Sequence, residues 1–101
     1  MDNLDHATFT ENLNGDFSVQ IDDSTTVKLL LTEVSELREA NRNDFFSVIF
    51  RGPREPMLPQ GLYGLENERM GSFEIFLVPV AETEAGYDYE AVFNRIKAKT
   101  S

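Results

Sequence analysis

The sequence predicts a mainly β fold, in which about six mostly antiparallel strands form a sandwich or a small barrel after one short N-terminal helix. Three observations support this prediction. Apolar and polar residues alternate along several short segments, as expected of half-buried strands. Turn-forming residues separate these segments at intervals of about 8 to 12 residues. The eight phenylalanines supply large side chains for one core.

The first element expected is a helix near residues 5–14. Asp5 is a suitable N-cap residue, and Asn14 followed by Gly15 is a suitable helix end. Four residues in and just before this segment recur at helical spacing, which predicts that they share one face of the helix. They are Leu4, Thr8, Phe9 and Leu13.

Two strands follow, joined by a polar turn at residues 22–24. The first covers residues 16–22 and the second covers residues 25–37, and both show the two-residue period of a strand. In the second strand the alternation slips, because Glu33 occupies the face of the preceding apolar residues. This slip predicts a β-bulge or a strand end at residues 32–34.

After a hairpin loop at residues 38–43, a third strand is expected to begin at Asp44. Both of its faces are apolar, which indicates a central strand. The strand stops at Arg51, and Gly52 is expected to mark a turn. A loop with prolines at 53, 56 and 59 then crosses to the next strand. We interpret this loop as a packed crossover, although its proline spacing also suits a ligand of SH3-like domains.

Three more strands complete the prediction, and the middle one is expected to end at Pro79 because proline cannot donate to a strand ladder. They cover residues 62–66, 72–80 and 87–93, with turns at 67–71 and 83–86. The chain is therefore interpreted as a single β-rich domain at residues 1–94, followed by a short basic C-terminal tail at residues 95–101.

Composition excludes several classes of function. The chain has 18 acidic and 9 basic residues and a net charge of −9, so we expect no binding to nucleic acid or to anionic membranes. It has no cysteine, which excludes disulfides, thiol nucleophiles and thiolate metal sites. The N-terminal segment lacks the basic and apolar regions of a signal peptide, so a cytoplasmic location is expected.

No cofactor or metal ion is predicted. His6 is the one histidine, and no second metal-ligating residue accompanies it at a suitable spacing. Asp22, Asp23 and Ser24 are oxygen donors in a loop, but they lack the spacing of a calcium-binding loop and are interpreted as a turn.

Glutamates in strands are the remaining residues that could carry catalysis. Glu33, Glu74 and Glu90 would form a glycosidase-like acid and base pair if two of them met in one cleft. We instead predict solvent-facing carboxylates or a structural ion pair that joins Arg51 with Glu33 or Glu90. The chain is accordingly predicted not to be an enzyme.

Two kinds of binding surface are considered. The exposed residues of the proline-rich crossing form a candidate contact surface for a partner protein, made of Arg54, Glu55 and Gln60. The alternative is a small-ligand or carbohydrate-binding barrel in which tyrosine rings stack on the ligand, using Tyr63, Tyr87 and Tyr89.

Five motifs in fixed order carry a resemblance to a known family. They are HATF at 6–9, FRGP at 50–53, LPQGLY at 58–63, FLVPV at 76–80 and YEAVFN at 89–94. This pattern resembles a family of small bacterial and phage-associated proteins known only as a domain of unknown function. That family often carries histidine where this chain has Asn67, so the resemblance implies no shared ligand at that turn.

The resemblance implies a role and no activity. Members are often encoded near phage-tail collar-like proteins, which implies an accessory or structural part of a phage-tail-like particle. The leading expectation is therefore a non-enzymatic structural or protein-interaction module with a protein partner, located in the cytoplasm or in such a particle. Self-association into a homo-oligomer is left open.

Overall fold

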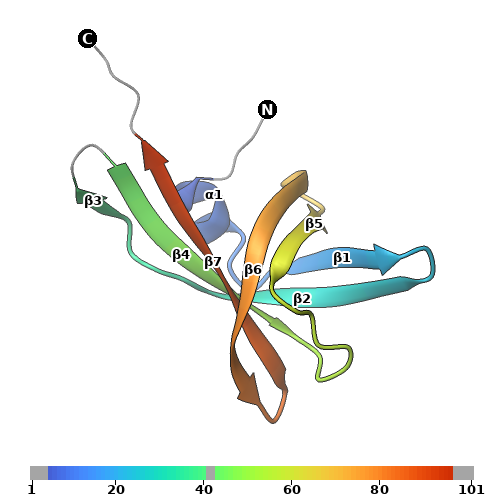
Figure 1. Cartoon of the computed structure of the whole chain (residues 1–101). Coiled ribbons are helices and arrows are strands. Elements are labelled where there is room, and N and C mark those ends of the chain that lie inside the picture. Colours follow the sequence, from blue (N-terminus) through green and yellow to red (C-terminus); the bar gives the residue numbers. More distant parts are fainter. Residues whose placement is uncertain (1–4, 41–42, 97–101) are drawn as a thin grey trace.

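The computed structural model describes residues 5–40 and 43–96 (Figure 1). Within these residues it has one short helix and seven strands. They are α1 (His6–Glu11), β1 (Asp16–Asp22), β2 (Thr25–Val34), β3 (Arg38–Ala40), β4 (Asn43–Gly52), β5 (Gly61–Asn67), β6 (Gly71–Thr83) and β7 (Gly86–Ile96). The predicted mainly β fold with one N-terminal helix is confirmed. The basic tail lies outside the described residues apart from its first two positions, which end β7.

The strands close into a barrel. Their order in the sheet is β2-β1-β5-β6-β7-β4-β3, and β2 pairs again with β4, so that six strands form a ring and β3 extends one side of β4. Every pairing in the described part of the chain is antiparallel. The sequence left sandwich and barrel open, and the pairing of β2 with β4 decides for the barrel.

β4 is the central strand that the sequence predicted. One of its edges pairs with β7 over its whole length, and the other pairs first with β3 and then with β2. The register between β2 and β4 shifts between Leu31 and Glu33, which confirms the predicted irregularity. The predicted hairpin loop at residues 38–43 was too long, because residues Arg38–Ala40 pair with β4 as β3.

β6 continues past the point where the sequence predicted its end. The strand passes through Pro79 and reaches Thr83, and the register with β7 shifts between Pro79 and Ala81. A bulge lets a strand accommodate a residue that has no backbone N–H, which is why proline did not end it. The predicted turn is confirmed, because the hydroxyl of Thr83 accepts the backbone N–H groups of Ala85 and Gly86, each at 3.1 Å.

α1 is anchored at both ends. The side chain of Asp5 accepts the backbone N–H of Thr8 at 2.9 Å, which confirms the predicted N-cap. After the helix, Asn14 takes a left-handed conformation with φ 70°, and its N–H donates to the carbonyl of Leu31 at 2.8 Å. Leu13 was expected on the buried face, but it follows the last helical residue and remains 42% exposed.

Phe9 is the residue that joins α1 to the barrel. Its ring is fully buried, with centroid distances of 5.3 Å to Phe93, 6.1 Å to Phe46 and 6.1 Å to Phe73. Phe46 and Phe93 also stack on each other at 4.8 Å. These four rings come from α1, β4, β6 and β7, so the cluster ties the helix to three strands.

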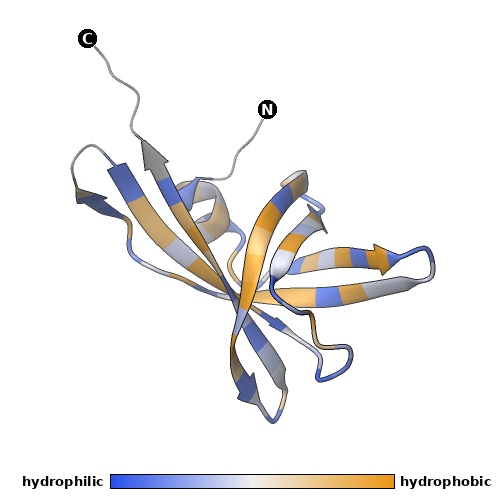
Figure 2. Cartoon of the chain, in the orientation of Figure 1, coloured by the Kyte–Doolittle hydropathy of each residue, from blue (hydrophilic) through white to orange (hydrophobic). Residues whose placement is uncertain are grey.

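The remaining core follows the alternation of the strands. Figure 2 shows apolar and polar residues alternating along β1 and β2. Inward-facing residues are almost fully buried along these strands and along β4, including Phe17, Val19, Val27, Leu29, Leu31, Val48 and Phe50. One face of each strand therefore forms a common interior.

The motif FRGP ends β4 at a point where chain segments come very close. Gly52 is buried, and a Cβ atom there would lie 2.8 Å from the side chain of Leu29. Gly86 begins β7 with φ 152°, and a Cβ atom there would lie 1.8 Å from the carbonyl oxygen of Gly52. Gly52 thus serves close packing at the end of β4, rather than the turn that the sequence suggested.

Replacing Phe9 with alanine tests the aromatic cluster. We expect Phe9→Ala to lower the free energy of unfolding by about 3–5 kcal/mol, because the cavity would lie among rings that α1 and the barrel share. Leu13→Ala is the matched control on an exposed side chain, with an expected loss below about 1 kcal/mol. Urea denaturation followed by far-UV circular dichroism measures both, and equal losses would contradict the importance of Phe9.

A second substitution tests the close approach at Gly86. We expect Gly86→Ala to lower the free energy of unfolding by more than about 2 kcal/mol, because the new methyl group meets the backbone of Gly52 in a conformation that favours glycine. Gly64→Ala is the control, since a Cβ atom there has no neighbour within 4 Å. Thermal unfolding compares the two, and a stable Gly86→Ala protein would refute this explanation.

Candidate functional site

The proline-rich crossing packs against the barrel, as predicted. Leu58 is buried at its centre, and its backbone N–H donates to the hydroxyl of Tyr89 at 2.8 Å. Tyr63 donates its own hydroxyl hydrogen to the carbonyl of Pro59. Two tyrosines from different strands therefore hold neighbouring residues of the crossing and fix where β5 begins.

These contacts determine whether the tyrosine rings are accessible to a ligand. Tyr89 is a core residue with 1% exposure, and burial raises its pKa above the ordinary value of 10.0. Burial likewise raises the pKa of Tyr63. Tyr87 is half-buried, and its hydroxyl lies 3.5 Å from a carboxylate oxygen of Glu82. The ring of Tyr89 is not accessible for stacking on a sugar, so the three tyrosines do not form one exposed platform.

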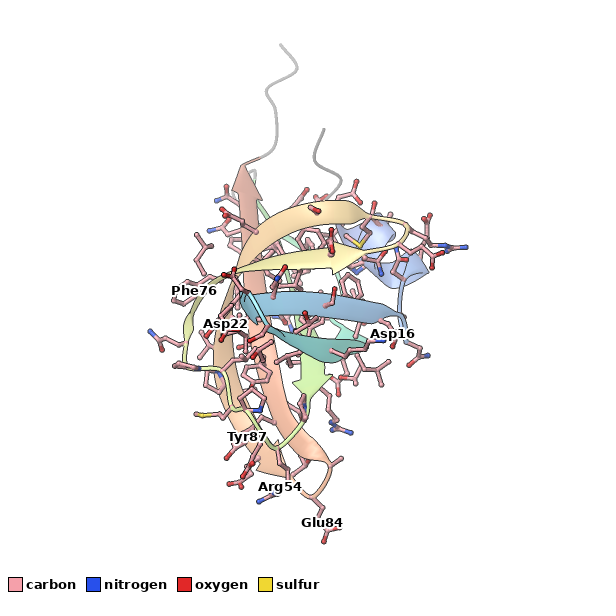
Figure 3. The ribbon with its side chains drawn as sticks, turned by 90° about the vertical axis from the view of Figure 1, so that its right-hand side faces the viewer. Asp16, Asp22, Arg54, Phe76, Glu84 and Tyr87 are labelled. Carbon is pink, nitrogen blue, oxygen red and sulfur yellow. The ribbon has the colours of Figure 1, made fainter. Side chains whose placement is uncertain are left out.

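The candidate contact surface on the crossing is exposed, but its arginine is engaged. Arg54 donates to the carbonyl of Thr83 at 2.9 Å and pairs with Glu82 at 3.0 Å. It thereby ties the crossing to the β6–β7 hairpin, and Figure 3 shows Arg54 beside Tyr87 and near Glu84 at this end of the molecule. Glu55 and Gln60 are also exposed.

Arg51 forms an ion pair, but its hydrogen-bonded partner is Asp88 rather than Glu33 or Glu90. The guanidinium donates to the two carboxylate oxygens of Asp88 at 2.8 and 3.3 Å. Asp88 lies directly opposite Arg51 in the register of β4 with β7. Hydrogen bonding and the negative charge of Asp88 raise the pKa of Arg51, and the charge of Glu33 adds to this effect.

The three strand glutamates lie on three different strands, β2, β6 and β7. Glu33 and Glu90 both lie opposite Ile49, on the two sides of β4, so their backbones are two strand spacings apart, or about 10 Å. Glu74 lies on β6 opposite Gly64 and lines a different surface hollow from Glu90. The structure therefore separates Glu74 from Glu90.

The other polar candidates have structural contacts. The Nε2 atom of His6 lies 2.7 Å from the carbonyl of Ser35, and the ring meets Phe46 edge-on at 5.3 Å. Asp22 accepts the backbone N–H of Ser24 at 2.9 Å, and this bond lowers the pKa of Asp22. In the described ranges no group of three or more His, Cys, Asp or Glu side chains is placed to hold a metal ion.

Sequence reasoning missed a set of exposed apolar side chains on the outer faces of β5, β6 and β7, of which the one on β7 lies beyond the point where β6 and β7 separate. We call it the apolar patch, and it consists of Leu62, Phe76 and Val92, with exposed fractions of 63%, 50% and 68%. Leu62 and Phe76 lie directly opposite each other. The signal in the sequence was the motif FLVPV, whose consecutive apolar residues must occupy both faces of a strand.

The buried hydroxyl of Tyr89 generates a prediction about stability and pH. Tyr89→Phe leaves the buried N–H of Leu58 without its acceptor, so we expect a loss of about 1–3 kcal/mol in the free energy of unfolding at pH 7. Because the folded-state pKa of Tyr89 is raised, its stabilising effect is complete below pH 10 and is lost as the pH rises through that pKa. The variant should therefore lose less stability than the parent protein between pH 9 and pH 11.

Urea denaturation across this pH range measures both effects. Tyr87→Phe is the control, since its hydroxyl contact is long and its side chain is partly exposed. If Tyr89→Phe matched the parent protein at pH 7 and at alkaline pH, the hydroxyl would not hold the crossing.

The chain was also compared with known proteins. Among the described residues no helix is long and apolar enough to cross a lipid bilayer. No curated protein and no solved structure matches the chain significantly. A family model described as a domain of unknown function (DUF6916) matches residues 4–93, which includes α1 and nearly all of the barrel. The predicted resemblance to a family of unknown function is thereby confirmed, and the chain belongs to the DUF6916 family.

Proposed function

We propose that this chain is a non-enzymatic protein-interaction module that acts as an accessory component of a phage-tail-like particle. The observation that carries the interaction role is the apolar patch. Phe76 and Val92 are at least half exposed. The chain has a net charge of −9, so it has many charged residues that could occupy these surface positions instead. Leu62 and Phe76 lie directly opposite each other, and adjoining exposed apolar side chains commonly mark a surface that another protein covers.

The contacts of the polar candidates support the non-enzymatic part. His6, Asp22 and Tyr89 each make a hydrogen bond that holds a turn or a crossing segment. Glu74 and Glu90 line separate hollows. A catalytic site needs such groups to converge on one reacting atom.

The place in a tail-like particle rests on the resemblance, whose members are often encoded near phage-tail collar-like proteins. Such a particle offers neighbouring proteins that would cover the apolar patch. The acidic surface favours a partner with a basic surface, since opposite charges steer association.

Co-expression with the products of neighbouring genes tests this function. Size-exclusion chromatography with light scattering should show a stable complex with at least one of them, at a mass above that of the chain alone. Phe76→Ser combined with Val92→Ser should weaken the complex, because both changes remove apolar contact area. Leu37→Ser is the matched control, at an exposed apolar residue outside the patch with 44% exposure.

Two results would contradict the proposal. One is a strict monomer that forms no complex with any neighbouring product. The other is a hydrolytic activity that survives purification and disappears with substitution of Glu33, Glu74 or Glu90.

A further inference from the structure

β6 and β7 separate halfway along their length. They pair from Val78 with Glu90 to Thr83 with Gly86. Beyond Val78 towards its N-terminal end, β6 pairs with β5 over Gly71–Leu77, while β7 beyond Glu90 follows β4. Figure 1 shows the two strands diverging above their crossing point, and Figure 3 shows the same divergence from the side.

This separation leaves an edge on β6. In the part of the chain that the structure describes, no strand other than β5 pairs with β6 over Gly71–Leu77. Each strand has hydrogen-bonding groups on two edges, so alternate N–H and C=O groups of this segment lack a strand partner. Seven residues extend over about 23 Å, the length of an ordinary strand. Such an edge can accept an added strand from another chain.

The side chains beside this edge favour one kind of occupant. Glu74 and Phe76 both point outward and are exposed, and Figure 3 shows Phe76 projecting away from the barrel. The last pair of β6 with β7 is Val78 with Glu90. Phe76 and Val92 each lie two residues beyond this pair, on the two strands that separate there. An added strand would therefore meet one carboxylate and two apolar side chains on its outer face.

A second copy of this chain fits poorly at the same edge. If Gly71–Leu77 paired antiparallel with itself over its full length, its central residue Glu74 would face Glu74 of the other copy. Like charges directly opposite each other destabilise a strand pair, and each copy also has a net charge of −9. The occupant should instead present a positive charge to Glu74 and an apolar residue to Phe76.

We propose that the free edge of β6 at Gly71–Leu77 accepts an extended segment of a partner protein with lysine or arginine opposite Glu74 and an apolar residue two positions away, opposite Phe76. This inference rests on the proposed interaction function and specifies the surface and the chemistry of the partner. Main-chain hydrogen bonds would supply a large share of the affinity, and alternate side chains would supply the specificity.

Hydrogen exchange of the 15N-labelled protein tests the edge directly. In the free protein we expect alternate amides of Gly71–Leu77 to exchange rapidly, while those bonded to β5 are protected. A nine-residue peptide with lysine at its centre and valine at the other positions should protect the rapidly exchanging amides, because it can place lysine opposite Glu74 and valine opposite Phe76. The same peptide with glutamate in place of the lysine should bind at least tenfold more weakly. Rapid amides that remain rapid at saturating lysine peptide would overturn the proposal.

Charge reversal tests the specificity. Glu74→Lys should weaken binding of the lysine peptide about two- to fivefold, as one cross-strand charge pair would. Glu84→Lys is the matched control, because it makes the same charge change on an exposed residue in the turn at the far end of β6. Equal weakening by both variants would show that overall charge, and not the edge, attracts the peptide.

The experiments separate this inference from the function on which it rests. If a neighbouring gene product forms a complex but leaves the amides of β6 unprotected, the interaction function stands and the proposed edge is wrong. If the protein binds neither the lysine peptide nor any neighbouring product, both fail.

Discussion

The structure depends on the attachment of β7 to β4 along the whole of β4. This pairing runs from Asn43 with Ile96 to Gly52 with Tyr87. It places Asp88 opposite Arg51, and it brings the start of β7 against the buried Gly52. β7 follows β4 without interruption on one edge, whereas on its other edge the pairing with β6 ends at Glu90, where β6 curves away with β5. The strand order closes the barrel, although β6 and β7 pair over only about half the length of β6. We call this partly paired junction of β6 and β7 the seam.

The aromatic cluster follows from that incomplete seam. Phe73 on β6 and Phe93 on β7 belong to strand segments that do not pair with each other, and Phe9 from α1 contacts both rings. A helix of six residues is too short to be stable alone, so tertiary contacts must hold it. Burial of Phe9 provides such a contact, and the contact of His6 with Ser35 provides another. The helix and the seam therefore stabilise each other.

Local signals in the sequence predicted those features that local residues determine. Asp5 was recognisable as a cap, Glu33 showed the register shift in β2, and the turn at residues 83–86 followed from its composition. Features that depend on distant register were missed. Arg51 finds Asp88 because of an alignment between strands 37 residues apart, and no spacing in the sequence encodes that distance. β3 was not predicted, because its three residues are all exposed and show no alternation of apolar and polar side chains.

The sequence did not predict the free edge of β6 for a related reason. Period-two alternation identifies the buried face of a strand, but it does not say which strand edge stays unpaired, since this depends on where β6 and β7 part. Proteins commonly protect a free edge with a charge that opposes pairing with a copy of itself. Glu74 occupies the middle of the free segment and Phe76 lies beside it, so the same few residues disfavour self-association and leave apolar surface exposed. Protection alone would be served better by a second polar residue in place of Phe76, and the exposed aromatic ring therefore supports the proposal that this edge is used.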